Sequence, residues 1–159
     1  MAIEDVFNGA KTALMFYDAY INTVAQEIGV ERATGLVTKM AENMGTMQGK
    51  MMKGQAGTKE CDAKAAWSLL RTFPEGLGLG FEVLQESPQR VLVKCAKCSV
   101  YEAAQMLGMD AKTIEHMCHA SSERFMDSFA KQLNPRLSFR VTKFRSPSDD
   151  FCEEETVLG

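Results

Sequence analysis

Thiol and imidazole side chains gather in one stretch of the chain. It holds three of the five cysteines and both histidines, namely Cys95, Cys98, Cys118, His116 and His119. A further cysteine, Cys152, follows near the C-terminus. Thiolate sulfur and imidazole nitrogen are the ligands that zinc and other borderline or soft metals prefer. The sequence therefore predicts a site that holds a metal or uses a reactive thiol.

The spacing of these residues sorts them into ligand candidates. Cys95 and Cys98 form a C-x-x-C pair, which can place two sulfurs on one ion. Because one helix cannot point His116, Cys118 and His119 at the same ion, we interpret His116 as an exposed surface residue. The remaining candidates are Cys118, His119 and Cys152. Zinc is the first metal that we expect; an iron–sulfur cluster, or buried thiols without a metal, are the alternatives.

Composition limits the class of protein. A chain of 159 residues, 45% hydrophobic and 25% charged, suits one globular domain over residues 1–159. A net charge of −3 gives no electrostatic reason to expect nucleic acid as a partner. No apolar run reaches the roughly 20 residues that span a bilayer, so we expect a cytoplasmic protein without a membrane partner. Five cysteines, an odd number, favour reduced thiols over a disulfide framework.

The N-terminal third predicts two long helices. Apolar residues recur at spacings of three and four from residue 3 to 28, where Gly29 would end the first helix. The same spacing predicts a second helix from Glu31 to Gly54, antiparallel to the first. Gly45 and Gly49 share one face of this helix. Close approach of another backbone is our first explanation, and room for a ligand is the alternative.

Methionines concentrate in the second helix. Five of the eleven lie between Met40 and Met52, and we interpret them as flexible core residues; a surface that binds a soft metal or an adaptable ligand is the alternative. The apolar rows of the two long helices together hold more apolar surface than one small sheet can cover. We therefore expect a homodimer.

The rest of the chain predicts short helices and two hairpins. Thr58 would cap a helix to Leu70 that carries Cys61 in its first turn and Trp67 in the core, with an irregular connection after it. From Gly80 the apolar period becomes two, and Ser87-Pro88-Gln89 would turn a hairpin. Later elements are a helix capped by Ser99 and ended by Gly108, one from Asp110 to Leu133, a strand over 137–142 and a strand over 151–158. Together these predict an α+β fold: a long helical hairpin packed with an antiparallel sheet of about four strands and further helices.

Several short motifs resemble one known family. The run C-S-V-Y-E-A-A-Q-M-L-G-M-D from Cys98, then Cys118, then N-P-R-L-S-F-R from Asn134, then D-D-F-C-E from Asp149 is similar to the C-terminal half of the L-2-amino-thiazoline-4-carboxylic acid hydrolase family. Its wider relatives are vinyl-reductase-like small-molecule-binding domains and transport-particle subunits. Ser99 stands where the family usually has proline, and Glu153-Glu154 where it usually has Asp or Trp followed by Phe.

The resemblance implies hydrolysis of a small cyclic amidine, thiazoline-type or related C–N bond. Cys98, Tyr101, Glu102, Cys118 and Cys152 match the motif. One expectation is a thiolate-bound zinc that activates a water, with Glu102 as general base. The alternative is a thiol nucleophile, Cys98 or Cys118, activated by His119. Tyr101 and Arg140 are the candidates for contact with the substrate. The alternatives are a vinyl-reductase-like domain that binds a small molecule without chemistry, and a metal or iron–sulfur protein.

Overall fold

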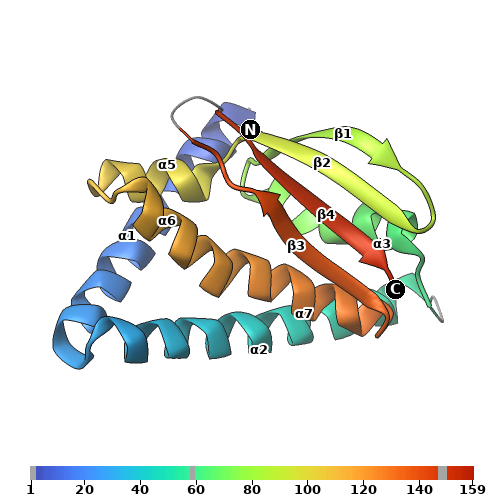
Figure 1. Ribbon diagram of the computed structural model, residues 1–159, viewed down its shortest axis with the longest axis horizontal. Helices are drawn as coiled ribbons and strands as arrows, with labels where there is room; N and C mark the ends of the chain where they lie inside the picture. Colours follow the sequence, from blue (N-terminus) through green and yellow to red (C-terminus); the bar gives the residue numbers. More distant parts are fainter. Residues whose placement is uncertain (1–2, 58–59, 147–149) are drawn as a thin grey trace.

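The computed structural model describes residues 3–57, 60–146 and 150–159, and it confirms the α+β fold (Figure 1). A helical hairpin precedes a β-hairpin, a run of helices and a second pair of strands. The helices are α1 (Ile3–Ile28), α2 (Val30–Ala56), α3 (Ala63–Leu70), α4 (Thr72–Gly76), α5 (Ser99–Met106), α6 (Ala111–Cys118), the π-helical η1 (His119–Glu123) and α7 (Arg124–Leu133). The strands are β1 (Gly80–Glu86), β2 (Arg90–Lys97), β3 (Leu137–Lys143) and β4 (Cys152–Leu158).

The two long helices join at Gly29, as predicted. Gly29 has a φ of 89°, a conformation that glycine adopts without steric cost. The predicted stop of α2 at Gly54 is wrong, because the helix continues to Ala56. Gly57 ends it with a φ of 63°, and its N–H donates to the carbonyl of Lys53 at 3.2 Å. Gly57, with its left-handed backbone, therefore terminates the helix, and Gly54 does not.

Glycines in α2 let helix α7 pack against it at close range. A Cβ on Gly45 would overlap the carbonyl of Phe125, and a Cβ on Gly49 would lie 2.7 Å from the carbonyl oxygen of Phe129. The two helices lie side by side along much of their length (Figure 1). This confirms close backbone packing as the reason for the two glycines.

The methionine seam is not the buried face of α2. Met40, Met44, Met47 and Met51 are 43–57% exposed, so their interpretation as core residues is wrong. The buried face runs instead through Ala33, Val37, Ala41, Gly45 and Gly49. Small residues face α7 because they permit the close approach, and the methionines lie beside them, partly exposed to solvent.

The segment before the sheet differs from prediction. Thr58 lies outside the described residues; the helix begins at Ala63, and the carboxylate of Asp62 caps it by accepting the N–H of Ala65 at 2.8 Å. Cys61 therefore precedes the helix and is buried in the core. The connection expected to be irregular contains the short helix α4.

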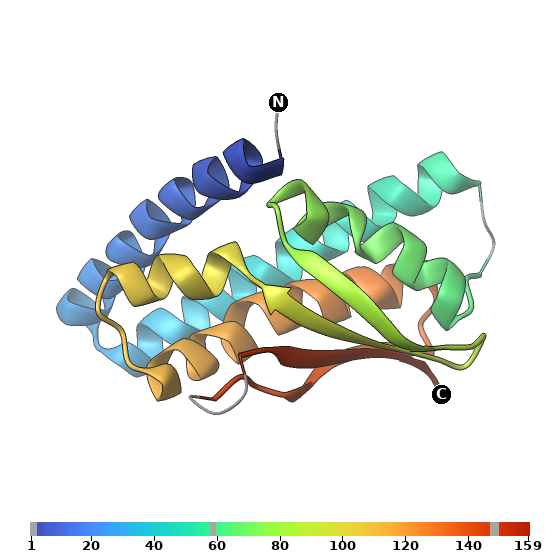
Figure 2. The same ribbon diagram turned by 90° about the horizontal axis from the view of Figure 1, so that it is seen from above.

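The sheet is antiparallel throughout, in the order β1-β2-β4-β3. The turn between β1 and β2 falls at residues 87–89, as predicted. Cys95 of β2 lies directly across from Cys152 of β4. The helices cover one face of the sheet (Figure 2). The pairing of the two central strands thus brings together two cysteines 57 positions apart.

Helix boundaries around the sheet correct two predictions. Cys98, and not Ser99, is the N-cap of α5, while the Ser99 hydroxyl donates to the carbonyl of Leu77 at 2.9 Å. The helix predicted from Asp110 to Leu133 is interrupted by the π-helical turn η1. A π turn inserts one extra residue into a helix and is frequent at functional sites. The extra residue rotates the side chains of α7 about the helix axis relative to those of α6.

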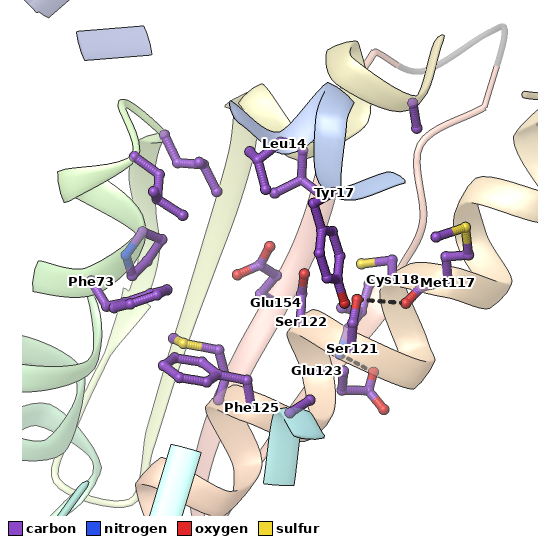
Figure 3. Close-up of a pocket in the computed structure, with 18 of the residues that line it drawn as sticks. Leu14, Tyr17, Phe73, Met117, Cys118, Ser121, Ser122, Glu123, Phe125 and Glu154 are labelled. Carbon is purple, nitrogen blue, oxygen red and sulfur yellow. Dashed lines mark hydrogen bonds between the residues drawn. The ribbon is translucent and has the colours of Figure 1, made fainter. Parts of the chain in front are cut away.

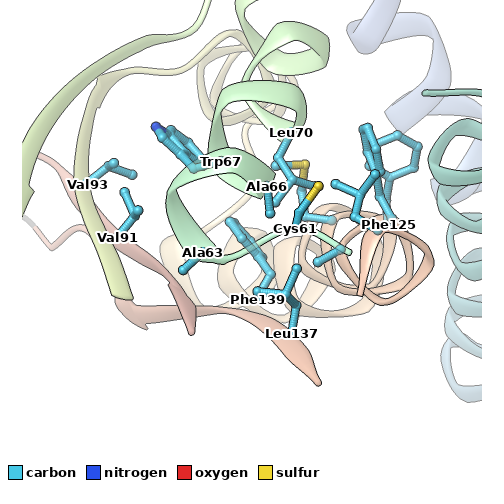
Figure 4. Packing of buried hydrophobic residues seen from close by; sticks show 14 of the residues in the cluster. Cys61, Ala63, Ala66, Trp67, Leu70, Val91, Val93, Phe125, Leu137 and Phe139 are labelled. Atoms are coloured by element: carbon cyan, nitrogen blue, oxygen red, sulfur yellow. The ribbon is translucent and has the colours of Figure 1, made fainter. Parts of the chain in front are cut away.

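The hydrophobic core lies between α3, α7 and the inner face of the sheet (Figure 4). Trp67 is 3% exposed, which confirms its predicted place in the core, and its ring meets that of Phe81 edge-on at 5.2 Å. The amide of Asn134 joins α7 to α3 by donating to the carbonyl of Cys61 at 2.9 Å. None of the helices in the described part of the chain is long and apolar enough to cross a membrane.

Candidate functional site

An apolar pocket of about 410 Å³ lies between α1, α2, α4, the helices α5 to α7 and the inner face of the sheet. Its wall is mostly aliphatic, aromatic and methionine side chains. The polar residues that line it are Tyr17, Asp18, Ser121, Ser122, Glu123 and Glu154 (Figure 3). A concave, largely apolar cavity of this size with a few polar groups is typical of a site for a small molecule.

Glu154 projects from β4 into this pocket (Figure 3). Burial raises the pKa of its carboxyl to about 8, and negative charge on Cys98 and Glu123 adds to the rise, while Arg145 opposes it. At neutral pH this carboxyl is therefore mainly protonated, and it can exchange a proton near pH 8. A carboxyl with such a pKa in a cavity is suited to acid–base chemistry.

A second acid approaches the pocket from α1. Asp18 is 4% exposed, its Oδ2 has no hydrogen-bond partner among the described residues, and burial raises its pKa to about 6. The hydroxyl of the adjacent Tyr17 is also buried without a described partner. Buried polar atoms are nearly always paired, so these two groups have unused hydrogen-bonding capacity at the pocket wall.

Three cysteines surround one buried arginine beside the pocket. We call Cys95, Cys98, Cys152 and Arg145 the thiol cluster. Arg145 is 6% exposed, donates through Nη2 to the carbonyl of Cys95 at 3.0 Å and hydrogen-bonds Cys152. Its guanidinium carbon lies 4.5 Å from the ring centre of Tyr101. The arginine gives this cluster a fixed positive charge.

Within the cluster, Cys98 is the thiol most readily ionised. Its pKa is lowered to about 7, first by the hydrogen bond with Cys95, and further by the backbone N–H of Tyr101 and by Arg145, against the effect of burial. The sulfur accepts that N–H at 3.5 Å as the N-cap of α5. Burial raises the pKa of Cys152 and Cys118, and the hydrogen bond with Cys98 raises the pKa of Cys95. One thiolate is therefore stabilised by the other groups.

Alkylation tests this assignment. We expect iodoacetamide at pH 7 to modify Cys98 at least about tenfold faster than Cys118, because the thiolate is the nucleophile and both cysteines are partly exposed. Peptide mass mapping after short exposure measures both rates in one sample. Equal rates at the two cysteines would contradict a stabilised thiolate at Cys98.

The structure brings together only part of the predicted site. Cys118 lines the pocket, and Cys95, Cys98 and Cys152 stand beside it. Tyr101 and Glu102 line a separate, more polar hollow together with Arg145. There Glu102 is 42% exposed and pairs with Lys11 at 3.2 Å.

The remaining candidates face acidic side chains or are exposed. The ring nitrogens of His119 face Glu123 at 3.0 Å and Glu115 at 3.8 Å. His116 is exposed, as expected. Arg140 is 66% exposed on β3 and pairs with Glu155 on the sheet face that the helices leave uncovered.

Metal ligation stays a prediction. Among the residues that the structure describes, no three His, Cys, Asp or Glu side chains are grouped so that they could hold a metal ion. Zinc and an iron–sulfur cluster were inferred from residue types alone. Elemental analysis of protein purified without oxygen would detect either.

The sequence matches the family described as L-2-amino-thiazoline-4-carboxylic acid hydrolase over residues 9–154. The chain belongs to this family. The match extends over most of α1 and all of α2, as well as the motifs from Cys98 onward. It therefore covers more of this chain than the short motifs do. A search of curated proteins found no match.

Solved structures share the fold of this hydrolase-family member. The phenol-responsive sensory domain of the transcription activator PoxR, solved with phenol, aligns with a TM-score of 0.64 at 13% identity, over 91% of this chain and 74% of that one. Trafficking protein particle complex subunit 3 from Naegleria fowleri, covalently bound to palmitic acid, aligns with a TM-score of 0.59 at 14% identity, over 95% of each chain. These likenesses confirm the expected relation to transport-particle subunits at the level of fold.

Sequence reasoning selected Cys118 of the pocket lining but missed Glu154, Asp18 and the nearby Arg145. Glu154 belongs to a run of three glutamates, which is typical of a solvated strand. Asp18 lies at a helix position flanked by apolar neighbours, and that was the available signal. Arg145 lies between the two strands predicted over 137–142 and 151–158, and its burial beside the cysteines depends on tertiary packing.

Proposed function

We propose that this protein binds a small, mainly apolar molecule in the pocket and hydrolyses an amidine-type C–N bond of it. One observation carries the proposal: Glu154, with a pKa near 8, stands in an apolar pocket beside the Cys98 thiolate. Paired groups whose surroundings shift their pKa values toward neutrality are typical of catalytic sites. Membership of the hydrolase family supports the reaction class.

In this reaction Glu154 acts as the general base. Its carboxylate takes a proton from water while the water oxygen bonds to the amidinium carbon. The carboxylic acid then returns that proton to the leaving nitrogen as the C–N bond breaks. The hydroxyl proton of the tetrahedral intermediate passes to the released amine, so the products are a carbonyl group and an ammonium group, which stay in one molecule where the broken bond belongs to a ring. Glu154 is again a carboxylate. Removal of water protons by a positioned base contributes about 10²–10⁴ in rate.

Cys98 assists by its charge in this scheme. It is absent from the described residues that line the pocket, whereas Glu154 and Cys118 are present. Its negative charge raises the pKa of Glu154 and so makes that carboxylate a stronger base. The sequence-based alternative, attack by the Cys98 sulfur on the substrate, requires the thiolate to reach the cavity.

The experiment is a pH profile of ring opening with 2-amino-thiazoline and its 4-carboxylate, followed by chromatography. We expect kcat/KM to rise with pH through about 8, where Glu154 loses its proton. In Cys98→Ser the rise should move to lower pH, with activity retained. Loss of all activity in a folded Cys98→Ser protein would favour the thiol nucleophile. No turnover of either compound by wild type would count against this hydrolysis.

A binding function without chemistry is the second candidate. The wall of the pocket is largely apolar, and the sensory domain of similar fold was solved with phenol. Saturable binding of a small aromatic molecule, with no turnover of any amidine, would favour this second function.

We also propose a homodimer through the exposed face of α2. Leu36, Met40, Met44, Met47 and Met51 are 43–57% exposed in one row, and Phe16 and Tyr20 of α1 are more exposed still. A contiguous exposed apolar row of this length marks an interaction surface more often than a free one. A second copy could bury it by the same residues on both chains.

Light scattering after size exclusion measures the assembly. We expect twice the mass of 17.6 kDa for wild type and the monomer mass for Met47→Lys/Met51→Lys, because two charges would enter the apolar interface. Met47 and Met51 are not among the described residues that line the pocket, so ligand binding serves as a folding control. A wild-type monomer at micromolar concentration would contradict the proposal.

A further inference from the structure

The pocket receives acidic side chains from three separate elements. Asp18 contributes from α1, Glu123 from η1 and Glu154 from β4. Among the described residues that line it, none is lysine, arginine or histidine. A ligand carboxylate inside would meet these acidic side chains in a medium of low dielectric constant, and no cationic side chain among the described lining residues would offset its loss of water.

Unused hydrogen-bonding capacity points to a ligand with N–H donors. Asp18 is 4% exposed, yet its Oδ2 accepts no hydrogen bond from the described residues. Because carboxylate oxygens are acceptors only, each ionised acid requires a donor, and an amidinium or ammonium group supplies several. The rest of the wall is apolar, which fits a hydrocarbon or aromatic body.

From this arrangement we infer that the pocket selects small apolar cations, of the amidinium or ammonium class, and excludes carboxylates. The inference rests on the pocket of the proposed function and deepens it by naming the charge of the ligand. The inferred selectivity would exclude a ligand that carries a 4-carboxylate, such as the compound in the family's description. The decisive group is Glu154, at a position where the family resemblance expects phenylalanine.

Binding of a cation should expel the Glu154 proton. The free carboxyl has a pKa of about 8, so about 0.9 of it is protonated at pH 7, and an adjacent positive charge lowers that pKa. We expect release of up to about 0.9 proton per bound cation at pH 7, and affinity about fivefold lower at pH 7 than at pH 8. Other titratable or charged groups around this carboxyl are Tyr17, Asp18, Cys98, Cys118, Glu123 and Arg145.

Calorimetry with three isosteric probes tests the inference. Benzamidine, benzamide and benzoate share a ring and nearly the same shape but are cationic, neutral and anionic. We expect benzamidine to bind at least about tenfold more tightly than benzamide, and benzoate about 100-fold more weakly than benzamidine. Titration in two buffers of different ionisation enthalpy measures the released proton.

Matched variants locate the effect. In Glu154→Gln the preference for benzamidine over benzamide should fall to within about threefold. Proton release should fall to about 0.1 proton or less, the share that Asp18 with a pKa of about 6 can supply at pH 7. Glu153→Gln changes the same chemistry on the opposite face of β4 and should keep the wild-type preference. Benzoate binding as tightly as benzamidine, a preference that survives in Glu154→Gln, or no binding of any probe would overturn the inference. Binding of benzamidine without turnover of any amidine would contradict only the proposed hydrolysis, and the inference about the charge of the ligand would stand.

Discussion

Replacing Glu154 by glutamine should lower kcat/KM for amidine hydrolysis on the order of 10³-fold. The amide keeps the size of the side chain, but it cannot take a proton from water. Because the carboxyl is buried in an apolar wall and mainly protonated at neutral pH, the neutral amide should fold as well as the parent. Steady-state rates and thermal unfolding of the same preparations measure the two effects separately.

Glu153→Gln is the control for this prediction. Glu153 precedes Glu154 on β4, and neighbouring residues of a strand point to opposite faces of the sheet. Its substitution should leave kcat/KM within about twofold of wild type. Equal losses in the two variants would assign the effect to the strand and not to a base in the pocket.

Gly45→Ala should destabilise the protein by about 3 kcal/mol. Its Cβ would overlap the carbonyl of Phe125, and that atom belongs to the backbone of α7, so no side-chain rotation can relieve the overlap. Helices α2 and α7 would have to separate along the glycine face. Urea unfolding followed by circular dichroism gives the change in free energy of unfolding.

Gly35→Ala, in the same helix, should have the opposite effect on stability. Gly35 is exposed, and a Cβ there would meet nothing within 4 Å. Alanine should therefore stabilise α2 by about 0.5–1 kcal/mol, the ordinary difference in helix propensity. Destabilisation of similar size at both glycines would contradict the close contact assigned to Gly45.

Local periodicity was sufficient to predict the fold class. The spacing of apolar residues predicted the helix up to Gly29, and the change to a period of two after Gly80 predicted the first β-hairpin. In α2 the same method selected the wrong face. Methionines and small residues both repeat at helical spacing there, and only the approach of α7 to Gly45 decides which row is buried.

The functional site was harder to predict because it depends on pairing between distant segments. The register between β2 and β4 places Cys95 opposite Cys152. The same register turns Glu154 toward the helices, although a run of glutamates is typical of a solvated strand. Arg145 gives no local signal at all, since its burial depends on the cysteines around it.

The proposed function requires that the carboxyl of Glu154 titrates near pH 8 inside the pocket. A carbon-13 NMR titration of the glutamate side-chain carboxyls measures this without knowledge of the substrate. We predict one resonance with a midpoint near 8 in the wild type, missing in Glu154→Gln and shifted to lower pH in Cys98→Ser, where the thiolate charge is lost. Titration of every glutamate below pH 6 would contradict the account.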